Sequence, residues 1–106
     1  MIYLDANATT PLADEVWEAM APWLREHFHN PSSTHQGGKR ARAAVEEARG
    51  IVAEWWGARE DEVIFTSGGT EANNIALLGV FEKARENGNI RPHIVSVVTE
   101  HPATRE

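Results

Sequence analysis

A chain of 106 residues with 42% hydrophobic and 25% charged residues has the composition of one small globular domain and not of a disordered segment. Its net charge of −6 argues against a nucleic-acid partner, which would call for a clustered basic face. Because there is no cysteine, a disulfide framework and thiolate chemistry within these residues are excluded. The sequence shows no targeting signal and no apolar run of membrane-spanning length, so we expect a cytoplasmic protein without a membrane partner.

Residues 2–4 form a short apolar stretch, and residues 5–11 are small and polar and are expected to form a loop. On residue types alone, the loop with Asn7, Ala8 and Thr9 is explained as a solvated connection with Asx and Thr turns. From residue 14 the pattern becomes helical, because apolar residues recur every four positions. Another part of the protein must cover this apolar face, which comprises Val16, Met20, Leu24 and Phe28 and is widened by Trp17.

Residues 30–38 break this helix and supply several N-cap candidates for the next one. The second helix is expected to have a face of small residues suited to close packing and to end at Gly57. His27, His29 and His35 lie around the break without the spacing of metal ligands, so no metal site is expected.

The most informative stretch is residues 62–74, in which an apolar run stops at Gly68 and Gly69 and a helix-compatible sequence follows. It predicts a buried strand, a sharp turn and a third helix over about residues 70–86. The glycines would let the backbone approach a ligand, and the first helical amides and the hydroxyl of Thr70 would favour an anion such as phosphate. An ordinary α/β turn is the alternative, since the lysine of a nucleotide P-loop and the dinucleotide glycine spacing are both absent.

A second buried strand is predicted at residues 93–99, so that strand, helix and strand form a βαβ unit of an α/β fold. Ligands of open α/β sheets bind beyond the carboxyl ends of the strands, where Gly69, Thr70 and His101 would lie. His101, fixed by Pro102, is suited to stacking on a flat ring or to moving a proton near neutral pH. The alternative is a histidine that only meets water.

Four stretches, in this order and spacing, resemble the N-terminal part of cysteine desulfurases of the NifS/IscS type, which are class V aminotransferase-like enzymes. They are residues 3–11, 30–35, 65–74 and 100–103, and the resemblance covers essentially the whole chain. The chain departs from the family pattern at His29, where a glycine is usual, and at Thr104 and Arg105, where aliphatic residues are usual.

The resemblance implies pyridoxal 5′-phosphate as the cofactor. Gly69 and Thr70 would hold its phosphate, and His101 would stack against the pyridine ring and assist proton transfer. Glu71 would point away from the phosphate, along the start of the helix. The active-site entrance or the dimer interface would be lined by Asn7, Ala8, Thr9 and Asn30.

The implied fold is a truncated part of the large domain of a fold type I pyridoxal-phosphate enzyme. Residues 1–11 would belong to the small domain and residues 12–106 to the first part of the large domain, with the remainder of both absent. The family's sheet places later strands between the two strands predicted here, so we expect these two not to pair. The resemblance implies that the lysine that binds the cofactor, the aspartate facing its ring nitrogen and the nucleophilic cysteine lie beyond residue 106. Lys39 and Lys83 fall on polar stretches of predicted helices and are expected to be solvated.

The implied function is that of a homodimeric cysteine desulfurase. It converts L-cysteine to L-alanine and an enzyme persulfide, and an acceptor or scaffold protein takes the sulfur for iron–sulfur cluster or thio-cofactor assembly. The 106-residue chain alone is expected to be inactive and to fold with little cooperativity. The alternatives are another class V enzyme, such as a selenocysteine lyase, and a non-catalytic module that binds phosphate or a partner.

Overall fold

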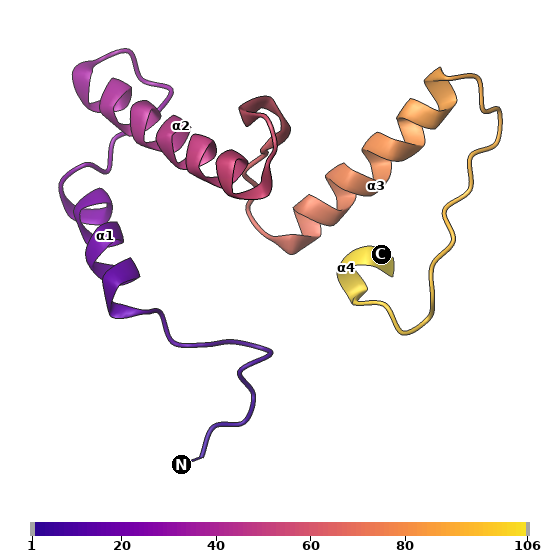
Figure 1. The fold of residues 1–106 in the computed structure, drawn as a ribbon, viewed down its shortest axis with the longest axis horizontal. Coiled ribbons are helices and arrows are strands. Elements are labelled where there is room, and N and C mark those ends of the chain that lie inside the picture. Colours follow the sequence, from indigo (N-terminus) through magenta and orange to yellow (C-terminus); the bar gives the residue numbers. More distant parts are fainter. Residues whose placement is uncertain (1, 106) are drawn as a thin grey trace. The chain divides into compact units, whose positions relative to one another are not determined.

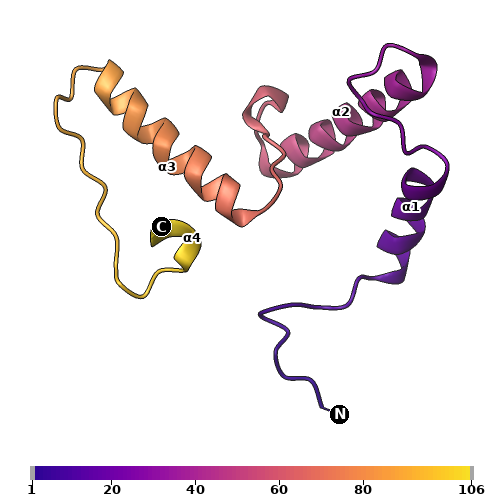
Figure 2. The same ribbon diagram turned by 180° about the vertical axis from the view of Figure 1, so that it is seen from behind.

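Helices α1 (Asp14–Arg25) and α2 (Gln36–Trp56) and the 3-10 turn η1 (Glu60–Glu62) form the first of two units, Met1–Val63. Helices α3 (Gly69–Glu86) and α4 (Pro102–Arg105) belong to the second unit, Ile64–Glu106 (Figures 1 and 2). The structure is a computed structural model and describes residues 2–105. The three long helices expected from the sequence pattern are therefore confirmed.

Helix α1 has the charge pattern expected of a helix, with acidic residues in its first turn and Arg25 in its last. It contains Pro22, which has no backbone N–H and therefore makes no helical bond at that position. The carbonyl of Pro22 accepts from the amides of Glu26 and His27, each at 2.9 Å, and the helix ends there. Phe28, expected on the apolar face of this helix, lies beyond its end and stacks on His29 with ring centroids 5.0 Å apart.

Helix α2 begins after His35, whose Nδ1 accepts from the amide of Gly38 at 3.2 Å. It ends as predicted at Gly57, which adopts a left-handed conformation with φ of 64°. The small residues of this helix supply its buried positions, Gly38, Ala41 and Ala53. Near its C-terminal half, the guanidinium of Arg49 donates to the carbonyl oxygen of Val63, which attaches the segment after η1 to the helix.

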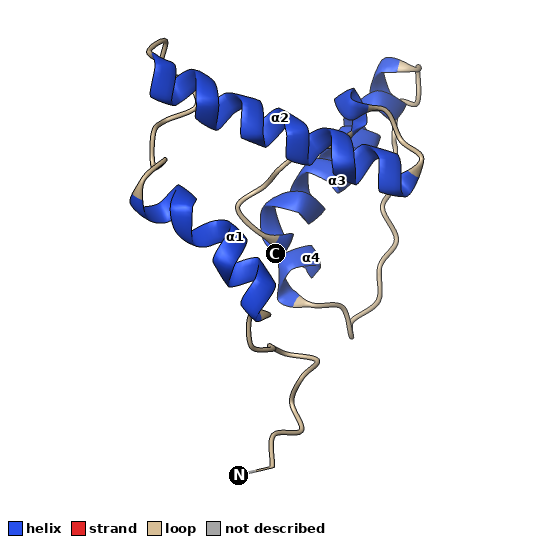
Figure 3. Ribbon diagram, turned by 60° about the vertical axis from the view of Figure 1, so that its left-hand side comes forward, coloured by secondary structure: helices blue, strands red, loops and turns tan. Residues whose placement is uncertain are grey.

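The strands predicted at residues 62–66 and 93–99 do not form among residues 2–105, for which the structure contains helices and loops only (Figure 3). Glu62 belongs to η1, residues 63–66 and 92–97 have no regular structure, and residues 98–99 form a turn. A strand satisfies its backbone amides and carbonyls by pairing with a neighbour, and the two segments do not pair with each other. The α/β part of the expected fold is thus not confirmed.

Few apolar side chains are buried in the part of the chain that the structure describes. Ala41 and Ala53 are the buried hydrophobic residues there, whereas Trp55 and Trp56 are 82% and 75% exposed. No described helix is both long and apolar enough to cross a membrane. The helices are therefore formed, but the apolar faces that should support them remain uncovered.

Candidate functional site

The turn before α3 presents several hydrogen-bond donors in one place. The first helical bond runs from the amide of Ala72 to the carbonyl of Gly68 at 3.1 Å. The amides of Gly69, Thr70 and Glu71 precede it and have no acceptor within residues 2–105, and the hydroxyl of Thr70 is likewise unengaged there. Such a group of amides carries the partial positive charge of a helix N-terminus and favours an anion.

Glu71 folds back over the turn and fixes its shape. One of its carboxylate oxygens accepts from the amide of Ser67 at 2.6 Å and from the Ser67 hydroxyl at 2.7 Å. These two bonds, the backbone bond first, hold the pKa of Glu71 below its ordinary value. The carboxylate is therefore ionised at neutral pH and points to the residue before Gly68. This position is close to that of a capping box, displaced by one residue toward the N-terminus.

The two glycines before and at the start of α3 leave the approach to this turn open. Gly68 has φ of 164° and ψ of −179°, which is extended backbone, so this position does not require glycine for its conformation. What the two residues do provide is access, because a Cβ built on either Gly68 or Gly69 would have no atom within 4 Å. A phosphate can approach the backbone here without displacing a side chain.

Taken together, these features fit the phosphate of a pyridoxal cofactor. Three amides and one hydroxyl lack acceptors within the described residues, and the approach to them is open. The carboxylate of Glu71, whose amide is one of these three donors, already accepts two hydrogen bonds from Ser67. Sequence reasoning placed Ser67 at the carboxyl end of the predicted strand but did not identify its hydrogen bonds to Glu71. The spacing of Ser67 and Glu71, four residues apart, was the available signal.

His101 belongs to the same unit as this turn and has a defined ring orientation. Its Nδ1 accepts from the amide of Ala103 at 3.1 Å, and its carbonyl accepts from the amide of Thr104 at 2.9 Å. Because Nδ1 is an acceptor, the neutral ring carries its proton on Nε2. The side chain is exposed, so Nε2 is accessible.

Helix α4, which follows His101, contacts α3. Figures 1 and 2 both show α4 (yellow) beside the N-terminal half of α3 (orange). The side-chain amide of Asn73 donates to the hydroxyl of Thr104 at 3.1 Å. The structure thus brings the turn with Gly69 and Thr70 and the segment with His101 to the same end of one helix.

The other predicted site residues lie in the first unit. Asn7, Ala8 and Thr9 occupy a turn in which the amides of Ala8 and Thr9 reach the carbonyl of Asp5 at 3.0 and 3.3 Å. The hydroxyl of Tyr3 lies 2.9 Å from the carbonyl oxygens of Asp5 and Thr9 and can donate its proton to either one. The side chain of Tyr3 therefore supports this turn, which the sequence reading described correctly as a loop.

Asn30 forms an Asx turn, in which its Oδ1 accepts from the amide of Ser32 at 2.8 Å. Its carbonyl accepts from the amide of Ser33 at 3.0 Å, so the residue shapes the loop before α2. Both interactions are local and explain the loop conformation without a ligand. The role of Asn30, Asn7, Ala8 and Thr9 at an entrance or dimer interface stays a prediction.

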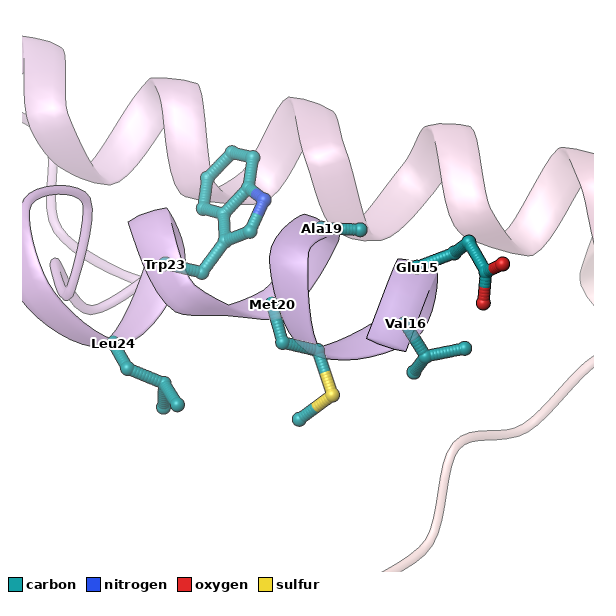
Figure 4. Close-up of a pocket in the computed structure, with 6 residues that line it drawn as sticks. All are labelled: Glu15, Val16, Ala19, Met20, Trp23 and Leu24. Carbon is teal, nitrogen blue, oxygen red and sulfur yellow. The ribbon is translucent and has the colours of Figure 1, made fainter. Parts of the chain in front are cut away.

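A hollow in the first unit lies away from this turn, along α1. It has a volume of about 490 Å³ and is bounded by six residues of α1, namely Glu15, Val16, Ala19, Met20, Trp23 and Leu24 (Figure 4). Figure 4 shows Val16, Met20 and Leu24 on one side of this helix, which is the apolar face expected from the sequence. Within residues 2–105 no three acidic, histidine or cysteine side chains are grouped as metal ligands would be.

Comparison with known proteins assigns the chain to a family. Residues 2–106 match the family model described as Aminotransferase class-V. The chain therefore belongs to the class V aminotransferase family, whose members are generally pyridoxal-phosphate dependent.

Individual relatives narrow the comparison. The cysteine desulfurase IscS of Dictyoglomus turgidum is 51% identical over 105 residues, which are 99% of this chain and 26% of that protein. The cysteine desulfurase IscS of Rickettsia bellii is 50% identical over 101 residues, or 94% of this chain and 24% of the relative. A solved NifS-like protein superposes with a TM-score of 0.78 at 36% identity, over 93% of this chain and 26% of that one. The chain thus spans about a quarter of the length of these relatives.

Proposed function

We propose that this chain is the N-terminal part of a pyridoxal-phosphate-dependent cysteine desulfurase. The observation that carries the proposal is the identity of about half of all residues, over almost the whole chain, to proteins named cysteine desulfurase. The same names favour this function over that of a selenocysteine lyase or a non-catalytic module. The fold we propose for the whole protein is the α/β fold type I, with residues 1–11 in the small domain and residues 12–106 beginning the large one.

In the proposed enzyme, the amides after Gly68 and the hydroxyl of Thr70 would hold the cofactor phosphate. Their support is the set of donors without acceptors at the start of α3 and the open approach over Gly69. Glu71 would not bind the phosphate but would keep the turn in shape through Ser67. When bound, pyridoxal phosphate supplies an electron sink for the bonds at the substrate's α-carbon.

His101 would contact the cofactor ring and hold a proton at Nε2. Its support is the bond from the Ala103 amide to Nδ1, which leaves Nε2 as the protonated and exposed nitrogen of the neutral ring. A proton positioned in this way assists bond making and breaking at the substrate without a change in the rest of the site.

The overall reaction transfers the sulfur of L-cysteine to an enzyme thiol. The C–S bond of the substrate breaks, an S–S bond forms on the enzyme, and the products are L-alanine and an enzyme persulfide. Since this chain has no cysteine, the thiol would lie in the remainder of the protein. We further propose a cytoplasmic homodimer that passes the sulfur to an acceptor or scaffold protein, with Asn7, Ala8, Thr9 and Asn30 near the entrance or the dimer interface.

The proposal is tested with the full-length protein that contains this chain, purified with pyridoxal phosphate. We expect equal amounts of L-alanine and persulfide from L-cysteine in a single turnover without reductant. L-Selenocysteine is the comparison substrate. Alanine release from selenocysteine with none from cysteine would replace the desulfurase by a lyase, and cofactor-free protein that binds no pyridoxal phosphate would overturn the proposal altogether.

A further inference from the structure

One hydrogen bond connects the two parts of the candidate site. The side-chain amide of Asn73 donates to Oγ1 of Thr104 at 3.1 Å, across 31 positions in the sequence and in a partly buried setting. It is a side-chain bond between α3, whose first turn contains Thr70, and α4, which begins directly after His101.

Asn73 lies on the same side of α3 as the turn at residues 67–70, which is called the phosphate turn below. It follows Gly69 by four residues and Thr70 by three, and residues at these spacings lie on the same face of a helix. A group bound to Asn73 is therefore held on the side of α3 that carries the start of the helix. The neighbouring Asn74 behaves differently, because its side chain bonds within the helix to the carbonyl of Thr70 at 2.9 Å.

The position of Thr104 is coupled to that of His101. Helix α4 has four residues, far fewer than an isolated helix needs for stability, so external contacts must hold it. His101 closes this turn through two bonds, from the amide of Ala103 to its Nδ1 and from the amide of Thr104 to its carbonyl. Movement of Thr104 therefore moves the imidazole ring.

We propose that Asn73 and Thr104 are positioning residues, which together hold the imidazole of His101 beside the phosphate turn at the N-terminus of α3. The link itself follows from the geometry. Only the statement that His101 acts on a cofactor ring rests on the proposed function.

The link gives a role to Thr104, at which the resemblance would imply an aliphatic residue. An aliphatic side chain cannot accept a hydrogen bond, whereas Thr104 accepts one from Asn73. The amide of Asn73 is partly buried, so loss of its acceptor leaves a donor with reduced access to water. We therefore expect Thr104→Val to lower the stability of this segment by more than the similar size of the two side chains suggests.

The first experiment uses cofactor-free full-length protein, so that it does not depend on activity. Hydrogen exchange of the peptide covering residues 100–105 is compared among wild type, Thr104→Val, Asn73→Ala and Thr104→Ser. Loss of one hydrogen bond should speed exchange about two- to tenfold in Thr104→Val and Asn73→Ala. Thr104→Ser keeps the hydroxyl and should exchange at the wild-type rate. Asn74→Ala is the matched control and should leave this peptide unchanged. Unchanged exchange in both Thr104→Val and Asn73→Ala would overturn the proposal.

A second measurement distinguishes positioning from general stability. In protein labelled with ¹⁵N-histidine, wild-type His101 should show the Nε2-protonated form, and Thr104→Val should increase the other tautomer while the remaining histidine signals stay unchanged. In the holoenzyme the same variant should lower kcat with little change in cofactor affinity. If no variant of Thr104 or Asn73 folds, a nuclear Overhauser effect between the Asn73 side-chain amide and the Thr104 methyl group in wild type still decides, and its absence would overturn the link. Failure of the proposed function would appear only as missing activity and would leave the exchange and tautomer results intact.

Discussion

At the scale of single residues, Glu71 controls the turn at the start of α3. Its folded-state pKa lies below the ordinary value of 4.5, since the carboxylate accepts from the amide and hydroxyl of Ser67. A carboxyl with a lowered folded pKa stabilises the folded form above its unfolded pKa, and this contribution is lost as the pH falls through the folded value. We therefore expect the turn to loosen below about pH 4.5 and not in the neutral range.

The measurement is the amide signal of Ser67 followed by NMR as the pH is lowered. In wild type its chemical shift and its exchange protection should change together as Glu71 takes up a proton. In Glu71→Gln this pH dependence should disappear. The control is Glu82→Gln, which changes an exposed glutamate on the same helix and should retain the pH dependence of the Ser67 amide. A pH-independent Ser67 amide in wild type would contradict the assignment.

Thr70 and His101 should separate cofactor binding from turnover in the full-length enzyme. Thr70→Ala removes one charge-assisted hydrogen bond to a phosphate, so cofactor affinity should fall by about 1.5 to 3 kcal/mol. His101→Ala should leave phosphate binding nearly intact and lower kcat, because it removes a ring contact and a proton carrier. Equilibrium dialysis with pyridoxal phosphate and steady-state kinetics measure the two effects. Equal cofactor affinity of Thr70→Ala and wild type would remove the phosphate assignment.

At the scale of the elements, two glycines of α2 differ in the space available for a side chain. A Cβ on Gly38 would lie 2.4 Å from the carbonyl oxygen of Ser33 and 2.8 Å from that of Asn30, and backbone atoms cannot move aside cheaply. Gly38→Ala should therefore weaken the start of the helix and the loop with Asn30 by about 1–3 kcal/mol. A Cβ on Gly50 would meet only Glu60 at 3.5 Å, an ordinary contact, so Gly50→Ala should stabilise the same helix by about 0.5–1 kcal/mol.

Amide exchange along residues 36–56 provides the comparison between the two variants. Gly38→Ala should increase exchange mainly in the first turns, and Gly50→Ala should decrease exchange in the middle of the helix. Both variants add the same methyl group, so a difference in sign isolates the close approach of the loop. A stabilised Gly38→Ala variant would show that the loop carrying Asn30 does not lie against α2 as described.

The elements also show where sequence reasoning succeeds and where it stops. Helix α2 was predictable to its last residue, because its hydrogen bonds are internal and Gly57 supplies the left-handed C-terminus. The segments at residues 63–66 and 93–97 have strand-like sequences, but a strand needs a partner that these residues do not provide. The candidate site follows the same rule. Gly69 and Thr70 were recognisable from a local motif, whereas the bond from Asn73 to Thr104 spans 31 positions and no local pattern indicates it.

At the scale of the whole molecule, secondary structure is present without a core. In the described part of the chain, Ala41 and Ala53 are the buried hydrophobic residues, and no large side chain is fully buried. Cooperative unfolding requires apolar side chains that lose many contacts at once. We therefore expect the isolated chain to unfold gradually on heating, followed by circular dichroism, and to associate at high concentration through its apolar faces. A sharp two-state transition of a monodisperse monomer would contradict this expectation.

The isolated chain should also lack desulfurase activity, because it has neither a thiol nor a lysine near the phosphate turn. Without cysteine it has no thiol to receive sulfur. Lys83 pairs with Glu86 at 3.1 Å and lies fourteen residues after Gly69, or about 21 Å along the helix, so it cannot reach a group held at the phosphate turn. Lys39 is exposed on α2 in the other unit.

Free pyridoxal phosphate would then be held by a few hydrogen bonds, which must offset an association cost of several kcal/mol or more, so binding should be weak and reversible. Incubation with pyridoxal phosphate and L-cysteine, followed by borohydride reduction, tests both points. Alanine above the background of the free cofactor, or specific labelling of Lys39 or Lys83, would show that the chemistry resides in these 106 residues after all.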